Sequence, residues 1–307
     1  MISETFSFET PDREKIFVYK WLPDNEIKAV VQIAHGMAEH ARRYEEFAKF
    51  LTDNSIAVYA NDHRGHGNTA GDLDKLGYFA DKNGWELVLK DMNRLTHIIK
   101  QEHPDKPIFL LGHSMGSLFA RAYMVKYPNE ISGVILSGTS GEGGLLVSLG
   151  KTIAKLQGTF THPKKQSQLL NDMTFKDYNK AFKPAKTDFD WLSRDEKVVQ
   201  DYINDPYCGQ VVSNRFYYDM LSLIQFINKD SSYTNAPKDM PVLMFSGEND
   251  PVGNFGKGVK KVYNKYKKAG VKDITLKLYP EGRHEMLNET NRSEVYNDVL
   301  QWINSKI

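Results

Sequence analysis

One stretch of the sequence limits the possible folds more than any other, the run 107–117 (PIFLLGHSMGS). Four apolar residues lead directly into Gly112-His113-Ser114-Met115-Gly116, which fits the G-x-S-x-G pattern of a nucleophile elbow. In that turn a strand reverses sharply into a helix, so the positions two before and two after the serine must be small. A helix-forming run, 117–126, follows and ends at Tyr127-Pro128-Asn129. The stretch therefore predicts a strand, an outward-pointing Ser114 and a helix.

Hydrophobic periodicity on both sides of this elbow predicts more strands and helices in alternation. An antiparallel hairpin is expected first, with strands at 5–8 and 15–21. The mostly apolar runs that we predict as further strands are 29–34, 55–60, 131–136, 241–246 and 274–279. The runs with helical spacing are 43–51, 85–99, 117–126, 254–269 and 293–304. Strands that alternate with helices indicate a mostly parallel sheet with helices on both faces.

The alternation stops near Gly141 and resumes near Pro237. Between them the runs 145–156, 191–203 and 211–227 have helical periodicity, and no convincing strand is found. We therefore expect an inserted helical segment of about a hundred residues between two halves of one sheet. The predicted division is a core of 1–140 and 238–307 with a helical cap of 141–237.

Composition excludes several classes of function. The 40 lysines and arginines nearly balance 39 acidic residues, so the net charge of +1 gives no reason to expect a nucleic-acid partner. The single cysteine, Cys208, cannot form an intrachain disulfide and suits a reducing compartment. The first residues lack the basic start and apolar run of a signal peptide, and no run of 18 apolar residues occurs. We therefore expect a cytoplasmic protein, and no residue spacing indicates a metal or another cofactor.

A serine becomes a good nucleophile only when a base accepts its proton, and that base works best when a carboxylate orients it. In the chain order serine, acid, histidine, the partners should follow later sheet strands at their carboxyl ends. Asp250 follows the predicted strand 241–246, and His284 follows 274–279 and is the only histidine after Asp250. Glu248 is the competing candidate for the acid; we favour Asp250 because it lies at the far end of the turn.

Acyl transfer also needs backbone N–H groups that stabilise a developing negative oxygen. One donor is expected from Met115, directly after the serine. The second is expected from Met37, in the loop after the strand 29–34, where Gly36 allows a close backbone approach.

Five motifs together resemble those of the monoacylglycerol lipase and lysophospholipase branch of the α/β-hydrolases, a group within the serine aminopeptidase-type hydrolases. They are His35-Gly36-Met37-Ala38-Glu39-His40, Asn61-Asp62-His63-Arg64-Gly65-His66-Gly67, 112–116, Asp250-Pro251-Val252 and Arg283-His284-Glu285. The resemblance covers nearly the whole chain outside the insertion. It implies an α/β-hydrolase fold with a mostly parallel eight-stranded sheet, helices on both faces and an inserted helical cap.

The same resemblance implies roles for individual residues. The triad would be Ser114, Asp250 and His284, and the oxyanion donors would be the N–H groups of Met37 and Met115. Four further family positions look structural or loop-bracing: His35, His40, Arg64 and His66.

The expected activity is that of a serine ester hydrolase that forms an acyl-enzyme on a monoacylglycerol or a lysophospholipid. Its partner would be a small acyl ester, and an apolar cap is compatible with transient membrane or micelle contact. An aminopeptidase or amidase of the same fold is the alternative, and a non-catalytic receptor is a third reading. Two apolar series in the cap are expected to cover the acyl chain. They are Leu145, Leu146, Val147, Leu149, Ile153 and Leu156, and Phe216, Tyr217, Met220, Leu221, Leu223, Ile224, Phe226 and Ile227.

Overall fold

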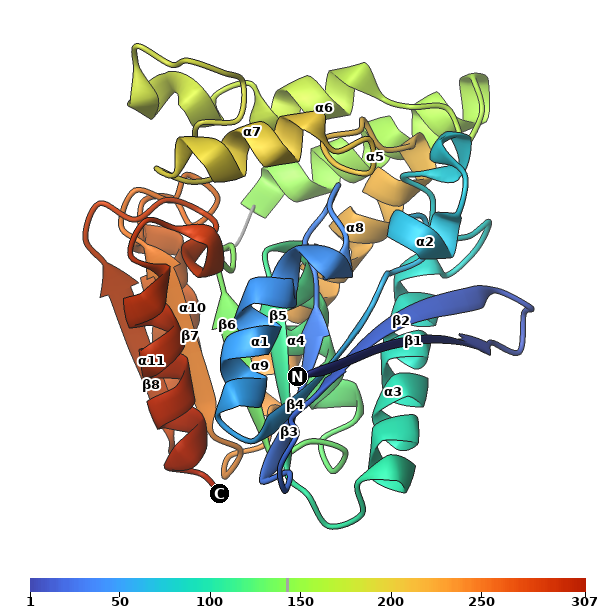
Figure 1. The fold of residues 1–307 in the computed structure, drawn as a ribbon. Coiled ribbons are helices and arrows are strands. Elements are labelled where there is room, and N and C mark those ends of the chain that lie inside the picture. Colours follow the sequence, from blue (N-terminus) through green and yellow to red (C-terminus); the bar gives the residue numbers. More distant parts are fainter. Residues whose placement is uncertain (142–143) are drawn as a thin grey trace.

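The computed structural model describes residues 1–141 and 144–307, and its described strands form one eight-stranded sheet (Figure 1). The spatial order is β1-β2-β4-β3-β5-β6-β7-β8. The strands are β1 (Ile2–Glu9), β2 (Lys15–Leu22), β3 (Ala29–Ala34), β4 (Ile56–Asn61), β5 (Ile108–His113), β6 (Gly133–Ser137), β7 (Val242–Gly247) and β8 (Ile274–Tyr279). β2 pairs antiparallel with β1 and β4, and the remaining pairs are parallel. The predicted mostly parallel sheet is confirmed.

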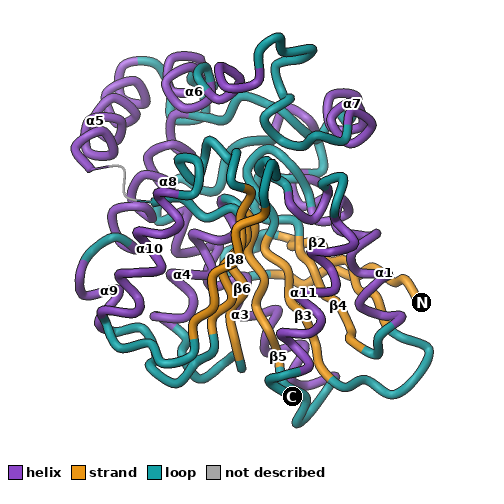
Figure 2. The backbone as a smooth tube through the Cα atoms, turned by 90° about the vertical axis from the view of Figure 1, so that its left-hand side faces the viewer, coloured by secondary structure: helices purple, strands orange, loops and turns teal. Residues whose placement is uncertain are grey.

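Helices cover both faces of this sheet. In Figure 2 helix α1 lies on one side of the strands, and α4 and α10 lie on the other. The helices of the two sheet halves are α1 (Glu45–Asp53), α2 (Gly67–Ala70), α3 (Gly84–Glu102), α4 (Met115–Lys126), α10 (Lys257–Lys268) and α11 (Arg292–Asn304). Short 3-10 helices lie at Ala41–Tyr44, Leu73–Lys75, Tyr178–Phe182 and Met286–Asn288.

The core consists of one apolar layer on each side of the sheet, as β5 demonstrates. All six of its residues are buried. Ile108 and Leu110 pack in the layer under α3 and α4, whereas Phe109 and Leu111 pack in the layer under α1 and α11. Successive side chains of a strand point to opposite faces, so a strand covered on both sides must be apolar throughout. This explains why the central strands are continuous apolar runs in the sequence.

The segment between β6 and β7 is helical, and its described part contains no strand beyond a single bridge between Gln166 and Ser213. Figure 1 shows it above the end of the sheet at which the parallel strands finish. Its helices are α5 (Gly144–Phe160), α6 (Gln168–Phe175), α7 (Glu196–Asn204), α8 (Asn214–Ile227) and α9 (Asp230–Thr234). None of the described helices is both long and apolar enough to cross a membrane.

Local boundaries differ from the sequence predictions where capping groups act. The helix predicted to start at residue 191 begins at Glu196, because the Asp195 carboxylate accepts hydrogen bonds from the N–H groups of Lys197 and Val198. Helix α10 begins later than predicted because Asn254, Phe255 and Gly256 all have positive φ angles. Helix α6 was not predicted; it starts at a Ser167 cap whose side chain accepts from the N–H of Leu170.

Candidate active site

Ser114 lies at the turn between β5 and α4, in a backbone conformation that few residues other than glycine adopt. Its φ and ψ angles are 50° and −117°. From residue 108 to residue 124 it is the only residue that is not fully buried. A Cβ atom at Gly112 would lie 2.2 Å from the Gly116 carbonyl oxygen, and one at Gly116 would lie 1.9 Å from that of Ala34. The predicted steric demand for two glycines is therefore present, and it leaves the serine as the one partly exposed residue of the turn.

His284 and Asp250 meet across 34 positions of sequence. The His284 Nδ1 atom lies 3.0 Å from Asp250 Oδ1, and both side chains are buried. The other Asp250 oxygen accepts a hydrogen bond from Ser246 Oγ at 2.9 Å, and Oδ1 also accepts from the Val252 N–H at 2.9 Å. A carboxylate only accepts, so Nδ1 carries the proton and Nε2 is left as a proton acceptor. Glu248, the competing acid, is exposed.

Ser114 and His284 line the same cavity, whose volume is about 590 Å³. Met37 and Met115 line it as well. Within residues 1–141 and 144–307, the backbone N–H groups of these two methionines have no protein acceptor. Met115 is the first residue of α4, where such N–H groups are unpaired and carry the positive end of the helix dipole. The residues that line the cavity therefore carry a hydroxyl, an imidazole and two N–H groups without a described acceptor.

The pKa of His284 reflects opposing influences. Burial lowers it, but the negative charge and the hydrogen bond of Asp250, together with Glu285 and Glu39, outweigh burial and raise the pKa above its ordinary value. The adjacent His113 behaves differently. Burial and the nearby His284 lower the pKa of His113 to about 4, and its Nδ1 lies 3.1 Å from Ser137 Oγ. His284 is therefore the basic imidazole of the pair.

A buried ion-pair network, which the sequence did not predict, joins the two loops that flank Ser114. Arg43 contacts Glu39 at 2.6 Å and both carboxylate oxygens of Glu285 at 2.7 Å. Burial raises the pKa of Glu285, but Arg43 outweighs this and lowers it to about 2. Glu39 in turn accepts from the Gly36 N–H at 2.5 Å. The network thus connects the residue after His284 with the loop that carries Met37.

Two residues of the inserted segment support the histidine loop from above. The backbone N–H groups of His284 and Glu285 donate to the carbonyl oxygens of Trp191 and Leu192, at 3.3 and 2.8 Å. The Trp191 ring also packs against the His284 ring, with centroids 5.2 Å apart. Such contacts restrict the orientation of the imidazole.

The four motif residues expected to be structural, His35, His40, Arg64 and His66, do not line the cavity. His35 Nε2 accepts from the His63 N–H at 2.9 Å, and His66 Nδ1 contacts the Arg64 carbonyl. Arg64 itself pairs with Asp12 and Asp91. These contacts hold together the loops that follow β3 and β4.

One group of possible metal ligands occurs in the described part of the chain: His40, Asp205 and Cys208. His40 Nε2 lies 2.8 Å from Asp205, and burial raises the pKa of the Cys208 thiol. The contact between His40 and Asp205 joins the inserted segment to the core.

Comparison with known proteins agrees with this geometry. Residues 25–291 match the family described as serine aminopeptidase, S33. The chain belongs to this family. A monoacylglycerol lipase of Mycolicibacterium smegmatis is 30% identical over 318 residues, covering 100% of both chains. Monoglyceride lipase of Mus musculus is 27% identical over 96% of this chain and 87% of its own.

Solved structures give the same result for the fold. A thermostable carboxyl esterase from Bacillus coagulans superposes with a TM-score of 0.92 at 30% identity, covering 99% of each chain. A soluble variant of the Saccharomyces cerevisiae monoglyceride lipase has a TM-score of 0.79 at 23% identity and covers 100% of this chain and 95% of that one. The α/β-hydrolase fold and the family predicted from the sequence are confirmed, and this S33 family member is a serine ester hydrolase.

Proposed function

We propose that this S33 family member hydrolyses single-chain lipid esters, a monoacylglycerol or a lysophospholipid, through an acyl-enzyme on Ser114. His284 is the proposed base and Asp250 the group that orients it. The observation that carries the proposal is that the partly exposed Ser114 shares a cavity with His284, whose Nδ1 is held by a buried Asp250. Relatives named monoacylglycerol or monoglyceride lipase over nearly the full chain support the choice of substrate class.

In the proposed reaction the Nε2 atom of His284 takes the Ser114 proton while Oγ attacks the ester carbonyl carbon. The tetrahedral oxyanion accepts hydrogen bonds from the N–H groups of Met37 and Met115. The alcohol leaves with the proton from His284, and a water molecule deprotonated by the same imidazole then releases the fatty acid.

The acyl chain is proposed to lie against α8, beneath a cap formed by residues 141–237. Four side chains of the second apolar series line the cavity, together with Leu118 of the core: Tyr217, Met220, Leu221 and Ile224. Phe216, Leu223 and Ile227 instead pack into the core layer. Burial of each methylene of a ligand contributes about 0.8 kcal/mol, so this lining favours a long chain over a short one.

The first apolar series, in α5, lies away from the cavity. None of its described side chains lines the cavity, and the side chains of Leu145 and Leu146 lie outside the described residues. Val147 is buried, whereas Leu149 and Leu156 are about half exposed, at 53% and 50%. Leu149, Leu156 and Phe160 recur at spacings of seven and four, so they share one outer face of α5. We propose that this face makes the transient contact of the cap with a membrane or micelle.

A specific observation keeps amide hydrolysis as the second candidate. The carboxylates of Asp172 and Asp188 line the same cavity and could hold a free amine. A panel of p-nitrophenyl esters from two to sixteen carbons, monoacylglycerols and aminoacyl amides tests the proposal. A kcat/KM that rises with chain length supports the lipid ester; a preference for acetyl esters or for aminoacyl amides would overturn it.

A further inference from the structure

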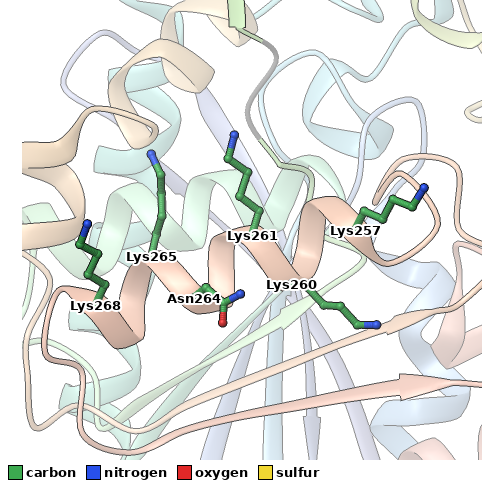
Figure 3. Close-up of a pocket in the computed structure, with 6 residues that line it drawn as sticks. All are labelled: Lys257, Lys260, Lys261, Asn264, Lys265 and Lys268. Atoms are coloured by element: carbon green, nitrogen blue, oxygen red, sulfur yellow. The ribbon is translucent and has the colours of Figure 1, made fainter.

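Helix α10 has an unusual concentration of positive charge. Its sequence, KGVKKVYNKYKK, contains six lysines and no acidic residue. The buried side consists of Val259, Val262 and Tyr266. Figure 3 shows five of the lysines extending away from the helix around Asn264: Lys257, Lys260, Lys261, Lys265 and Lys268.

The stability of the helix does not account for all of these lysines. Lysines in the last turn interact favourably with the negative end of the helix dipole. Lys257, Lys260 and Lys261 lie in the first half, where that benefit is absent, and like charges three or four positions apart destabilise a helix. Within the described residues, Lys257 and Lys260 form no ion pair, whereas the partly buried Lys265 has Asp230 at 3.7 Å. Lys257 and Lys260 therefore present positive charge at a cost to the stability of the helix.

An exposed aromatic ring lies beside these charges. Phe255, two residues before α10, is 45% exposed. Asn254, Phe255 and Gly256 have consecutive φ angles of 50°, 53° and 76°. Asparagine and glycine adopt this left-handed conformation readily, but a phenylalanine rarely does. The turn therefore holds Phe255 in a strained backbone with nearly half of its surface exposed.

The position of α10 relates this surface to the cap. A Cβ atom at Gly141 would lie 2.9 Å from the Gly258 Cα atom, so the chain leaves the core for the inserted segment directly beside the start of α10. Figure 2 shows α5 and α10 on the same side of the molecule. The start of α10, with Lys257, thus lies beside the point at which the chain enters the cap.

We propose that Phe255 and the lysines of α10 form a second contact surface, specific for anionic lipid head groups. Lysines beside an exposed aromatic ring are typical of segments that lie in a membrane interface. The net charge of +1 gives little attraction for the chain as a whole, so the selectivity for anionic lipid would arise at this surface. The inference rests on the proposed function for its biological setting, since a lipid ester substrate is found at such interfaces.

Cosedimentation of the full chain with lipid vesicles tests this surface. We expect binding to phosphatidylcholine vesicles that contain phosphatidylglycerol to be tighter, by about tenfold or more, than binding to phosphatidylcholine alone. The difference should shrink as salt is added. Equal binding to both vesicles would overturn the proposal.

Two variants and a matched control locate the effect. The double variant Lys257→Glu with Lys260→Glu should lower binding to the anionic vesicles by about tenfold or more. Phe255→Asn, which suits the left-handed backbone, should weaken it further while leaving its salt dependence in place. Lys15→Glu with Lys28→Glu changes the net charge by the same amount at exposed lysines elsewhere and should leave binding unchanged. An equal loss in this control would contradict the assignment.

Two further measurements distinguish a lipid surface from a folding defect and from a general polyanion site. All variants should retain activity on soluble p-nitrophenyl butyrate, which also shows that they fold. If the wild-type chain lacked that activity yet still bound anionic vesicles selectively, only the proposed function would fail. If duplex DNA displaced the chain from the vesicles and bound it independently of Phe255, the surface would bind polyanions in general and the lipid proposal would be wrong.

Discussion

The two halves of the sheet and the segment inserted between them use apolar residues in opposite ways. Every residue of β3, β5 and β7 is buried, and these strands position the loops with Met37, Ser114 and Asp250. The inserted segment instead carries six of the ten exposed large apolar side chains in the described part of the chain: Leu149, Leu156, Phe160, Leu169, Met173 and Ile203.

This contrast separates two kinds of task. Groups that react must be held rigidly, which a fully packed sheet provides. Groups that meet a lipid must offer apolar surface that folding leaves uncovered. Changes in the loops at the carboxyl ends of the strands should therefore slow the hydrolysis of every ester alike. Changes in the inserted segment should alter which ester, and which physical form of it, is hydrolysed.

The largest effect expected is that of Ser114→Ala. Removal of the hydroxyl eliminates the covalent route, and losses of this kind are about a millionfold in kcat. The loss should be equal for butyrate and for long-chain esters, because Ser114 lies at the carboxyl end of β5 and not in the inserted segment. Steady-state hydrolysis of both esters by wild type and variant gives the measurement, with fluorophosphonate labelling to report the nucleophile and circular dichroism to check folding. If the purified variant kept a kcat within tenfold of wild type, Ser114 would not be the nucleophile.

The next effect concerns the acid. Asp250→Asn should lower kcat by about four orders of magnitude, because the amide can hold the wrong imidazole tautomer. Glu248→Gln is the matched control and should have little effect, since Glu248 is exposed and Asp250 contacts His284. If the glutamate variant were the more damaging of the two, the assignment of the acid would be reversed.

A smaller effect should come from the inserted segment. Extending the acyl chain by four carbons should raise kcat/KM by roughly two orders of magnitude, until the cavity is filled or diffusion limits the rate. Ile224→Ala enlarges the cavity and should reduce this gain for long chains while leaving butyrate hydrolysis unchanged. A loss shared equally by short and long esters would show that α8 supports the catalytic residues instead of the acyl chain.

The pH dependence should distinguish His284 from its neighbours. His284 must be neutral to accept the serine proton, so kcat/KM should fall about tenfold per pH unit below its pKa. Since that pKa is raised, the fall should begin above the value of about 6.5 typical of histidine. Glu285, with a pKa of about 2, and His113, with a pKa of about 4, titrate too low to produce it. A profile flat from pH 5 to pH 8 would argue against a histidine base.

The sequence predicted the strands and the loops that follow them better than it predicted the inserted segment, for a physical reason. Buried parallel strands are continuous apolar runs, and the loops after them carry Ser114, Asp250 and His284 in a fixed order. Local pattern was therefore sufficient to locate the strands and to place these three residues after them. The pair between Arg43 and Glu285 joins residues 242 positions apart, and no local pattern indicates it.

Amphipathic helices of the inserted segment were harder to interpret. Periodicity shows that α5 has an apolar face but does not show what that face contacts. The series in α5 was predicted to cover the acyl chain, yet its described side chains do not line the cavity. Helix α6 is short, and its single buried residue, Leu170, gives little periodic signal.

The smallest effect expected is at Phe160, which is 82% exposed on the outer face of α5. If that face touches a lipid surface, Phe160→Ser should lower hydrolysis of a monoacylglycerol in micelles or vesicles by about fivefold. Hydrolysis of soluble butyrate should not change, because Phe160 does not line the cavity. Leu73→Ser removes a 53% exposed apolar residue from the core half and is the matched control. If both variants lost the same amount of activity on micelles or vesicles, the cause would be a general loss of stability. The outer face of α5 would then have no special role in contact with lipid, and the contrast between the sheet and the inserted segment would not apply there.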